Sequence, residues 1–255
     1  MAFVERTLRA GRNALAYIQT PGALRARLTW PHFSWSIFRT LDRLRRGGAS
    51  YQTILDVGAN IGVFSVAASE FFPGARIEAF EPIPDCREKF LRNVARTSGT
   101  QPRLWSVALG RNRSRATFHV NEHTPSSSIL RMLPEHEVEF PDARRTRPID
   151  VEIETLDDLM SAIGPSRPCL LKIDVQGYEL EVLSGGPRFL AFVDDVIVEC
   201  SVRPLYDGAP SAEEVISILS EHGFCLSDVA GELRESASRR AMQFDLQFSR
   251  PRKPL

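Results

Sequence analysis

The amino-acid sequence predicts an α/β protein with a doubly wound, mostly parallel sheet. From Tyr51 onward, short apolar runs alternate with amphipathic stretches, a glycine-rich turn follows the first apolar run, and acidic residues end several of these runs. Strands that alternate with helices favour a parallel sheet with right-handed crossovers. Ligands of such sheets bind beyond the carboxyl ends of the strands, which is where the acidic residues fall.

Length and composition indicate an ordinary globular protein. The chain has 255 residues, of which 43% are apolar and 25% charged. We expect one domain over residues 51–255, preceded by a basic helical arm over residues 1–50. No apolar stretch reaches the roughly 18–20 residues that span a bilayer, and we expect no signal peptide. The four cysteines are widely spaced, which favours a reducing cytoplasm over a zinc site or a disulfide framework.

The net charge of zero is unevenly distributed. The first 50 residues carry a charge of +7 and the remaining 205 carry −7, so the domain lacks the positive excess of a nucleic-acid binder, and no nucleic-acid partner is expected. Apolar spacing predicts amphipathic helices over Val4–Ile18 and Phe33–Leu44 of the arm. The arm's arginines are either solvated on helices that pack on the domain, or they form a surface for anionic lipid or a phosphate-bearing substrate. The second alternative predicts peripheral contact with the inner face of a membrane.

Apolar runs bounded by turn residues predict the strands, and helical periodicity predicts the helices. The expected strands are Thr53–Val57, Arg76–Phe80, Arg103–Leu109, Ala116–Val120, one that begins at Val151, Cys169–Val175, Asp194–Cys200, Gly223–Val229 and Met242–Phe248. The expected helices are Ile61–Phe72, Pro84–Thr97, one that ends at Met160, and Ser211–His222 with Ser211 as its N-cap.

The turn after the first strand, "DVGANIG" (Asp56–Gly62), discriminates between cofactors. A nucleoside triphosphate loop needs a lysine next to the phosphates, and this turn has none. A dinucleotide loop needs a glycine where Asn60 stands, so that the backbone can approach the diphosphate. Asp56 would repel a diphosphate but attract a cation, and Glu81 at the end of the second strand is placed to accept ribose hydroxyls. Together they predict S-adenosylmethionine, which carries sulfonium and ammonium groups.

Acidic residues also end two later strands. Lys172 and Asp174 share one side of the strand "CLLKIDV", and Glu199 ends the next strand. Methylation of a hydroxyl requires its proton to leave, which calls for a base or a divalent ion. The candidate catalytic residues are Asp174, Glu199, Lys172 and His123 in the irregular segment Asn121–Leu130, and a metal site is not favoured. The alternatives are that Lys172 and Asp174 only pair at the strand end, and that His123 faces solvent.

Five segments of the chain resemble the FkbM-family methyltransferases. The first four are "LDVGANIGVFS", "FEPIPDCREKFLRNV", "SSSI" and "LKIDVQGYELEVLSG", and a fifth, "VIVECSVRPLY", follows them. The resemblance covers the chain from about Tyr51 to Val229. It implies the Rossmann-like class I methyltransferase fold, with a seven-stranded sheet whose last strand is antiparallel. It also implies O-methylation of a hydroxyl on a sugar, glycan or natural product.

The resemblance also implies roles for individual residues. By position, the methionine part would contact Asp56, Gly58, Asn60 and Gly62, the ribose Glu81, the adenine Ser106, Val107 and Ala108, and the substrate Ser127 and Ser128. Many family members have Glu at the position of Gln176, so this chain lacks one carboxylate for a metal. Two alternatives stay open: a nucleic-acid methyltransferase, which only the arginine-rich arm supports, and a non-catalytic S-adenosylmethionine-binding protein of the same fold.

Overall fold

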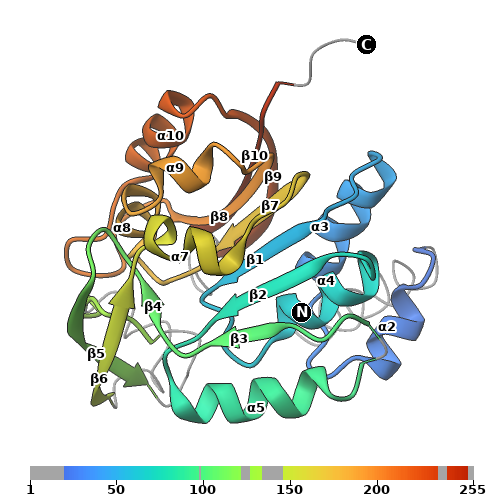
Figure 1. The fold of residues 1–255 in the computed structure, drawn as a ribbon, viewed down its shortest axis with the longest axis horizontal. Coiled ribbons are helices and arrows are strands. Elements are labelled where there is room, and N and C mark those ends of the chain that lie inside the picture. Colours follow the sequence, from blue (N-terminus) through green and yellow to red (C-terminus); the bar gives the residue numbers. More distant parts are fainter. Residues whose placement is uncertain (1–19, 98, 122–126, 134–145, 235–239, 252–255) are drawn as a thin grey trace, which may run out of the picture.

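The computed structural model describes residues 20–97, 99–121, 127–133, 146–234 and 240–251. A seven-stranded sheet in the order β3-β2-β1-β7-β8-β10-β9 forms its centre, with helices on both faces (Figure 1). Its strands are β1 (Thr53–Val57), β2 (Arg76–Phe80), β3 (Arg103–Trp105), β7 (Cys169–Ile173), β8 (Asp195–Ser201), β9 (Cys225–Arg234) and β10 (Ala241–Ser249). β10 runs antiparallel to both of its neighbours, and the other paired strands are parallel. The predicted doubly wound sheet with an antiparallel last strand is therefore confirmed.

A three-stranded sheet lies beside the carboxyl ends of β1 and β2 (Figure 1). It consists of β4 (Ala108–Leu109), β5 (Ser114–Asn121) and β6 (Thr146–Glu154). The single strand predicted over Arg103–Leu109 is therefore wrong in extent. β3 pairs with β2, whereas β4 pairs with β6 and Ala108 packs against apolar residues of that strand. An apolar run that changes its partner sheet looks continuous in sequence, because both halves are apolar.

Helices pack on both faces of the large sheet. One face is covered by α7 (Leu156–Ile163), α8 (Glu179–Ser184), α9 (Pro187–Leu190) and α10 (Ala212–Glu221), and the other by α3 (Trp35–Arg46), α4 (Val63–Phe71) and α5 (Pro84–Val94). Leu55 and Val57 of β1 belong to the first core, whereas Ile54 belongs to the core under α3 and α4, as the two-residue period of a strand requires. α10 begins at the predicted N-cap Ser211, whose side chain forms a capping box with Glu214.

The described part of the arm packs on the sheet. It contains α2 (Ala23–Thr29) and α3, which begins at the N-cap Ser34 and buries Leu41 in the core beneath β1. α3 thus lies close to the predicted Phe33–Leu44, while the predicted helix Val4–Ile18 lies outside the described residues. Among the arm's arginines, Arg45 and Arg46 both pair with Asp42, and Arg43 pairs with Asp228 of β9.

Among the residues that the structure describes, no helix is long and apolar enough to cross a bilayer. Contact of the arm with a membrane surface stays a prediction.

Candidate active site

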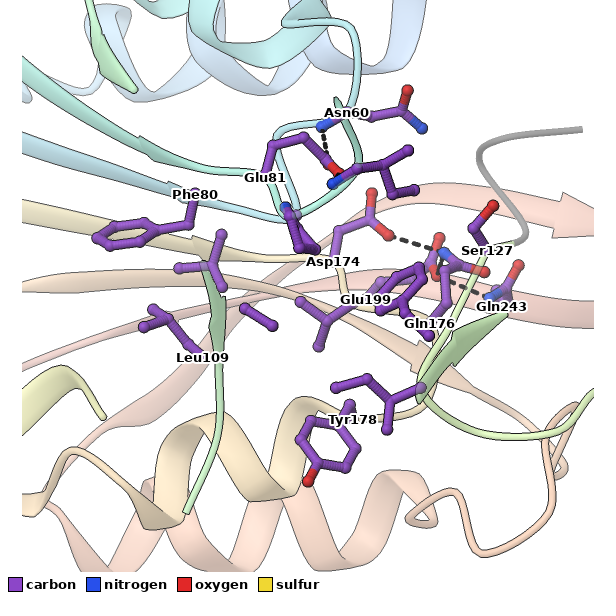
Figure 2. Close-up of a pocket in the computed structure, with 18 of the residues that line it drawn as sticks. Asn60, Phe80, Glu81, Leu109, Ser127, Asp174, Gln176, Tyr178, Glu199 and Gln243 are labelled. Carbon is purple, nitrogen blue, oxygen red and sulfur yellow. Dashed lines mark hydrogen bonds between the residues drawn. The ribbon is translucent and has the colours of Figure 1, made fainter. Parts of the chain in front are cut away.

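A cavity of about 380 Å³ opens where the strands of the large sheet end next to the small sheet (Figure 2). Residues from β1, β2, β4 and their loops line it with Val57, Gly58, Asn60, Phe80, Glu81, Pro82, Ile83, Val107, Ala108 and Leu109. Residues from β7, β8, β10 and the small sheet add Phe118, Ser127, Ile129, Asp174, Val175, Gln176, Tyr178, Glu199, Gln243, Phe244 and Asp245. The cavity therefore joins the predicted cofactor loop to the predicted catalytic carboxylates, at the sheet edge where α/β proteins bind ligands.

The glycine-rich turn adopts a backbone that most side chains would forbid. Gly58 has a φ of +79°, and a Cβ atom there would overlap the carbonyl oxygen of Asp174. Asn60 has a φ of +47°, a left-handed conformation that Asn tolerates better than most residues. Gly62 has a φ of +87°, begins α4 and faces the Phe90 ring. Gly58 and Asn60 line the cavity, while Gly62 lies outside the lining and lets the turn enter the helix.

Glu81 ties this turn to the end of β2. Its Oε2 accepts a hydrogen bond from the Asn60 N–H (2.8 Å) and its Oε1 accepts one from the Ile83 N–H (2.7 Å). Burial raises the pKa of the Glu81 carboxyl to about 7, although both N–H groups favour its ionised form. Each carboxylate oxygen has a second lone pair, so Glu81 can still accept hydroxyl donors from the cavity. Its structural bond to Asn60 is a second role that the sequence does not reveal.

Asp56 does not line the cavity. It is 0% exposed, accepts a hydrogen bond from the Ser65 hydroxyl (2.7 Å), and its Oδ1 lies 3.2 Å from the Lys172 Nζ. Lys172 also lies 3.4 Å from Asp174, so these two residues pair, and a catalytic role for either of them stays a prediction. The charge of Asp56, which we expected to attract a cationic ligand directly, is compensated by Lys172. Direct contact of Asp56 with the cofactor stays a prediction.

Burial opposes the charge of Lys172, but the carboxylates of Asp174 and Asp56 outweigh it. They raise the pKa of Lys172 above its usual value, so the ammonium stays charged. Lys172 therefore connects the carboxylate behind the cofactor loop with the carboxylate at the end of β7.

Gln176 brings the two predicted catalytic carboxylates together. Its Nε2 donates to Asp174 Oδ1 (2.8 Å) and to Glu199 Oε2 (2.7 Å), as Figure 2 shows. Gln243 Nε2 donates to the same Glu199 oxygen (2.7 Å). The sequence suggested Gln176 only as a missing carboxylate, and its central position in this cluster was not foreseen. The sequence does place Gln176 two residues after Asp174, at the end of that strand, which could have indicated its position near the carboxylates.

Three carboxyl groups, those of Asp174, Glu199 and Asp245, line this part of the cavity, near the ammonium of Lys172. Burial, and after it the negative charge of Asp174, raises the pKa of Glu199 well above its usual range. The same two causes raise the pKa of Asp245 to about 6. Asp245 was not predicted, since it becomes a neighbour of Glu199 only through the antiparallel pairing of β10 with β8. Within the described ranges, no three His, Cys, Asp or Glu side chains are grouped as a metal site.

The remaining predicted site residues divide into two groups. Val107, Ala108 and Ser127 line the cavity, whereas Ser106 is exposed and lies outside the lining. Ser128 is buried, and its hydroxyl donates to the Gln176 carbonyl oxygen (2.7 Å), so it supports that turn. His123 lies outside the described residues, and its role stays a prediction.

The arm and the last hairpin supply a wall that the sequence did not suggest. Ser36 of α3 lines the cavity together with Gly231 and Leu233 of β9. A Cβ atom at Gly231 would overlap the Asp245 carboxylate, so glycine lets this acidic side chain lie beneath β9. The arm therefore contributes directly to the cavity.

The sheet order, the glycine-rich turn after β1 and the acid that ends β2 define a class I methyltransferase. A family model described as "Methyltransferase FkbM domain" matches residues 56–226, and the chain belongs to this family. The protein is therefore an S-adenosylmethionine-dependent methyltransferase. The turn at Gly58, the remaining acceptor capacity of Glu81 and the apolar wall at Val107 and Leu109 fit this methyl donor.

Two relatives indicate the range of the family. The chain is 29% identical to the 2-O-methyltransferase NoeI of Sinorhizobium fredii over 172 residues, which is 65% of this chain and 70% of that protein. It is 26% identical to the 31-O-demethyl-FK506 methyltransferase FkbM of Streptomyces tacrolimicus over 200 residues, covering 67% of this chain and 72% of that protein. A similar solved structure is the magnesium protoporphyrin IX methyltransferase of Synechocystis PCC 6803, with 12% identity, a TM-score of 0.48, and coverage of 92% and 94%.

Proposed function

We propose that this protein methylates a hydroxyl group of a sugar, glycan or related natural product. The names of two relatives support the transfer to oxygen, since one is a 2-O-methyltransferase and the other acts on 31-O-demethyl-FK506. The observation that carries the proposal is the single cavity that joins Gly58 and Glu81 to Asp174 and Glu199. A methyl donor and a proton acceptor would thus share one enclosed space.

The methyl donor would be held by cavity residues that the sequence predicts for this role. The turn at Gly58 and Asn60 would hold the methionine part, Glu81 would accept the ribose hydroxyls, and Val107 with Ala108 would contact the adenine ring. When bound, S-adenosylmethionine supplies an electrophilic methyl group. Apolar side chains such as Phe80 and Leu109 would keep water away from this part of the cavity.

Asp174 would act as the base for the acceptor hydroxyl. As the hydroxyl oxygen forms its bond to the methyl carbon and the bond from that carbon to the donor sulfur breaks, the hydroxyl proton would pass to the Asp174 carboxylate. The Lys172 ammonium, 3.4 Å from Asp174, would hold this carboxylate in place. Ser127 would bind a further hydroxyl of the acceptor, because it lines the same cavity. Most of the rate would come from alignment of the acceptor oxygen with the methyl carbon.

The arm and the domain would build the site together. In this proposal residues 51–255 form the methyltransferase domain, and the arm closes one side of its cavity through Ser36. Acceptor selection would then depend on residues that lie outside the matched family segment, such as Ser36, Gln243 and Asp245.

The proposal is tested in two steps with the full chain. Calorimetry should show binding of S-adenosylmethionine and no binding of NAD. Incubation with methyl-labelled S-adenosylmethionine and a panel of neutral methyl glycosides, uronic acid glycosides and polyhydroxylated macrolides should then give an alkali-stable labelled methyl ether. RNA is included as the competing acceptor. Label that appears in RNA, or as an alkali-labile ester, would contradict O-methylation of a small-molecule hydroxyl.

A further inference from the structure

The Gln176 side chain has a partner for each of its hydrogen-bonding groups. Its Nε2 donates to Asp174 and Glu199, and its Oε1 accepts a hydrogen bond from the Tyr206 hydroxyl (3.0 Å). The nitrogen must face the two carboxylates, because only an N–H can donate to them. The Tyr206 hydroxyl occupies the other end of the amide, which fixes its orientation.

The backbone of Gln176 is also held in place. Its φ of +55° lies in the left-handed region, which a residue with a side chain adopts only when the surroundings hold it there. The Ser128 hydroxyl donates to its carbonyl oxygen (2.7 Å), and the next residue, Gly177, donates its N–H to Glu179 Oε1 (3.0 Å). Two elements outside β7 therefore hold the turn that projects the amide between the carboxylates.

The partners of the two carboxylates differ. Asp174 accepts one hydrogen bond from Gln176 and has the Lys172 ammonium at 3.4 Å. Glu199 Oε2 accepts from both Gln176 and Gln243, so a proton on Glu199 resides on Oε1. Burial beside Asp174 favours the protonated form of Glu199. The two carboxyl groups therefore differ in their partners: Asp174 faces the Lys172 ammonium and one amide, whereas Glu199 faces two amides.

We infer that Gln176 is a positioning residue for methyl transfer: its amide orients the Asp174 carboxylate as the proton acceptor and ties it to the neighbouring Glu199. This inference rests on the proposed function, because it assumes that Asp174 receives the hydroxyl proton. A glutamate at this position would place a third carboxylate against the other two and remove both N–H donors. A methionine would keep the length and volume of the side chain but leave Asp174 free to turn away.

The test compares Gln176→Met, Gln176→Glu and wild type on the acceptor that the wild type methylates. Gln176→Met should lower kcat about 100-fold, while KM and the affinity for S-adenosylmethionine change less than about threefold. Gln176→Glu should shift the acid limb of the kcat profile upward by about one pH unit or more, because a third carboxylate in this group makes each further ionisation more costly. Gln101→Met is the matched control, since Gln101 donates to the Val94 carbonyl oxygen of α5 and does not line the cavity, and it should leave both quantities unchanged.

A readout that needs no acceptor accompanies the kinetics. In Gln176→Glu the introduced carboxyl should have a raised pKa in the folded state, so folding favours its protonated form. Its Tm deficit relative to wild type should therefore be small near about pH 5 and grow toward about pH 8. A deficit that does not depend on pH would overturn the assigned contact with the carboxylates.

The outcomes separate the two proposals. A wild-type protein that transfers no methyl group to any hydroxyl acceptor contradicts the proposed function itself. Wild-type turnover together with an unchanged kcat in folded Gln176→Met, or an unchanged pH profile in Gln176→Glu, overturns the role of Gln176 alone. If Gln176→Met does not fold, the pH profile of Gln176→Glu decides the question.

Discussion

The Asp56 carboxylate and the Lys172 ammonium form a buried ion pair across the neighbouring strands β1 and β7, with 3.2 Å between Oδ1 and Nζ. Lys172 extends this pair to Asp174, and its Nζ also donates to the Gly58 carbonyl oxygen (3.4 Å). The acid of the glycine-rich turn is therefore connected to the proposed base through one lysine. This arrangement links the geometry of the donor loop to that of the catalytic end.

Removal of the lysine should destabilise the fold. Lys172→Met leaves the Asp56 charge buried without its partner, which costs about 3–5 kcal/mol of unfolding free energy. The double variant Asp56→Asn, Lys172→Met should recover part of this loss, because it removes both charges. Urea denaturation measures the three variants. A Lys172→Met protein within about 1 kcal/mol of wild type would show that the pair contributes little.

Gly58→Ala should abolish binding of S-adenosylmethionine. The added Cβ would overlap the Asp174 carbonyl oxygen, and the positive φ of Gly58 disfavours any side chain, so the turn must move. We expect an affinity loss of at least about 30-fold by calorimetry. Gly74→Ala is the matched control, since a Cβ there meets no atom within 4 Å, and it should bind normally.

Glu81 should make cofactor binding depend on pH. Its pKa of about 7 means that the carboxylate, the stronger acceptor for ribose hydroxyls, forms as the pH rises. Affinity for S-adenosylmethionine should thus increase from about pH 6 to about pH 8 in wild type, and be weaker and flat in Glu81→Gln. Calorimetry at each pH measures this. The exposed Glu88→Gln should retain the wild-type profile, and a flat wild-type profile would contradict the role of Glu81.

The same residue predicts a stability effect of defined sign. The folded-state pKa of Glu81 lies above its ordinary value of 4.5, so the protonated form favours folding. This contribution is complete below about pH 4.5 and is lost as the pH rises through about 7. Glu81→Gln, which cannot ionise, should have a Tm deficit relative to wild type that shrinks over this range. Thermal unfolding at several pH values checks it, and a growing deficit would reverse the assignment.

Ser36→Phe should affect the acceptor without affecting the methyl donor. Ser36 lines the cavity beside Gly231 and Asp245, away from the glycine-rich turn. A larger side chain there should raise the acceptor KM about tenfold and leave the affinity for S-adenosylmethionine unchanged. Ser220→Phe on the exposed side of α10 is the control. An unchanged KM would remove the arm from the acceptor site.

The sequence predicts the parts of the fold that depend on local pattern. β1 and β2 begin and end at the predicted residues, because their apolar runs are bounded by turn residues. The meeting of Asp174 with Glu199 is also predictable, since both end neighbouring parallel strands. The break near Ser106 is not predictable, because both halves of the run are apolar and only their partner strands differ.

The unpredicted parts of the site come from long-range contacts. Asp245 and Ser36 reach the cavity from the last strand and from the arm, far from the glycine-rich turn in sequence. The direction of the Asp56 side chain was likewise hidden, because it depends on Lys172 in the adjacent strand. A carboxylate in a sequence motif therefore predicts a negative charge near the ligand. The side chains that pair with this carboxylate, such as Lys172 here, decide whether its charge can act on the ligand.

The most direct test of the central claim is the methyl-transfer rate of Asp174→Asn, measured beside its affinity for S-adenosylmethionine. The variant keeps the size of the side chain but cannot take up a proton. We expect kcat to fall by about 100-fold or more while the affinity changes less than about threefold. Asp150→Asn, at an exposed position of β6, should behave as wild type. An Asp174→Asn protein with the wild-type kcat would contradict the account.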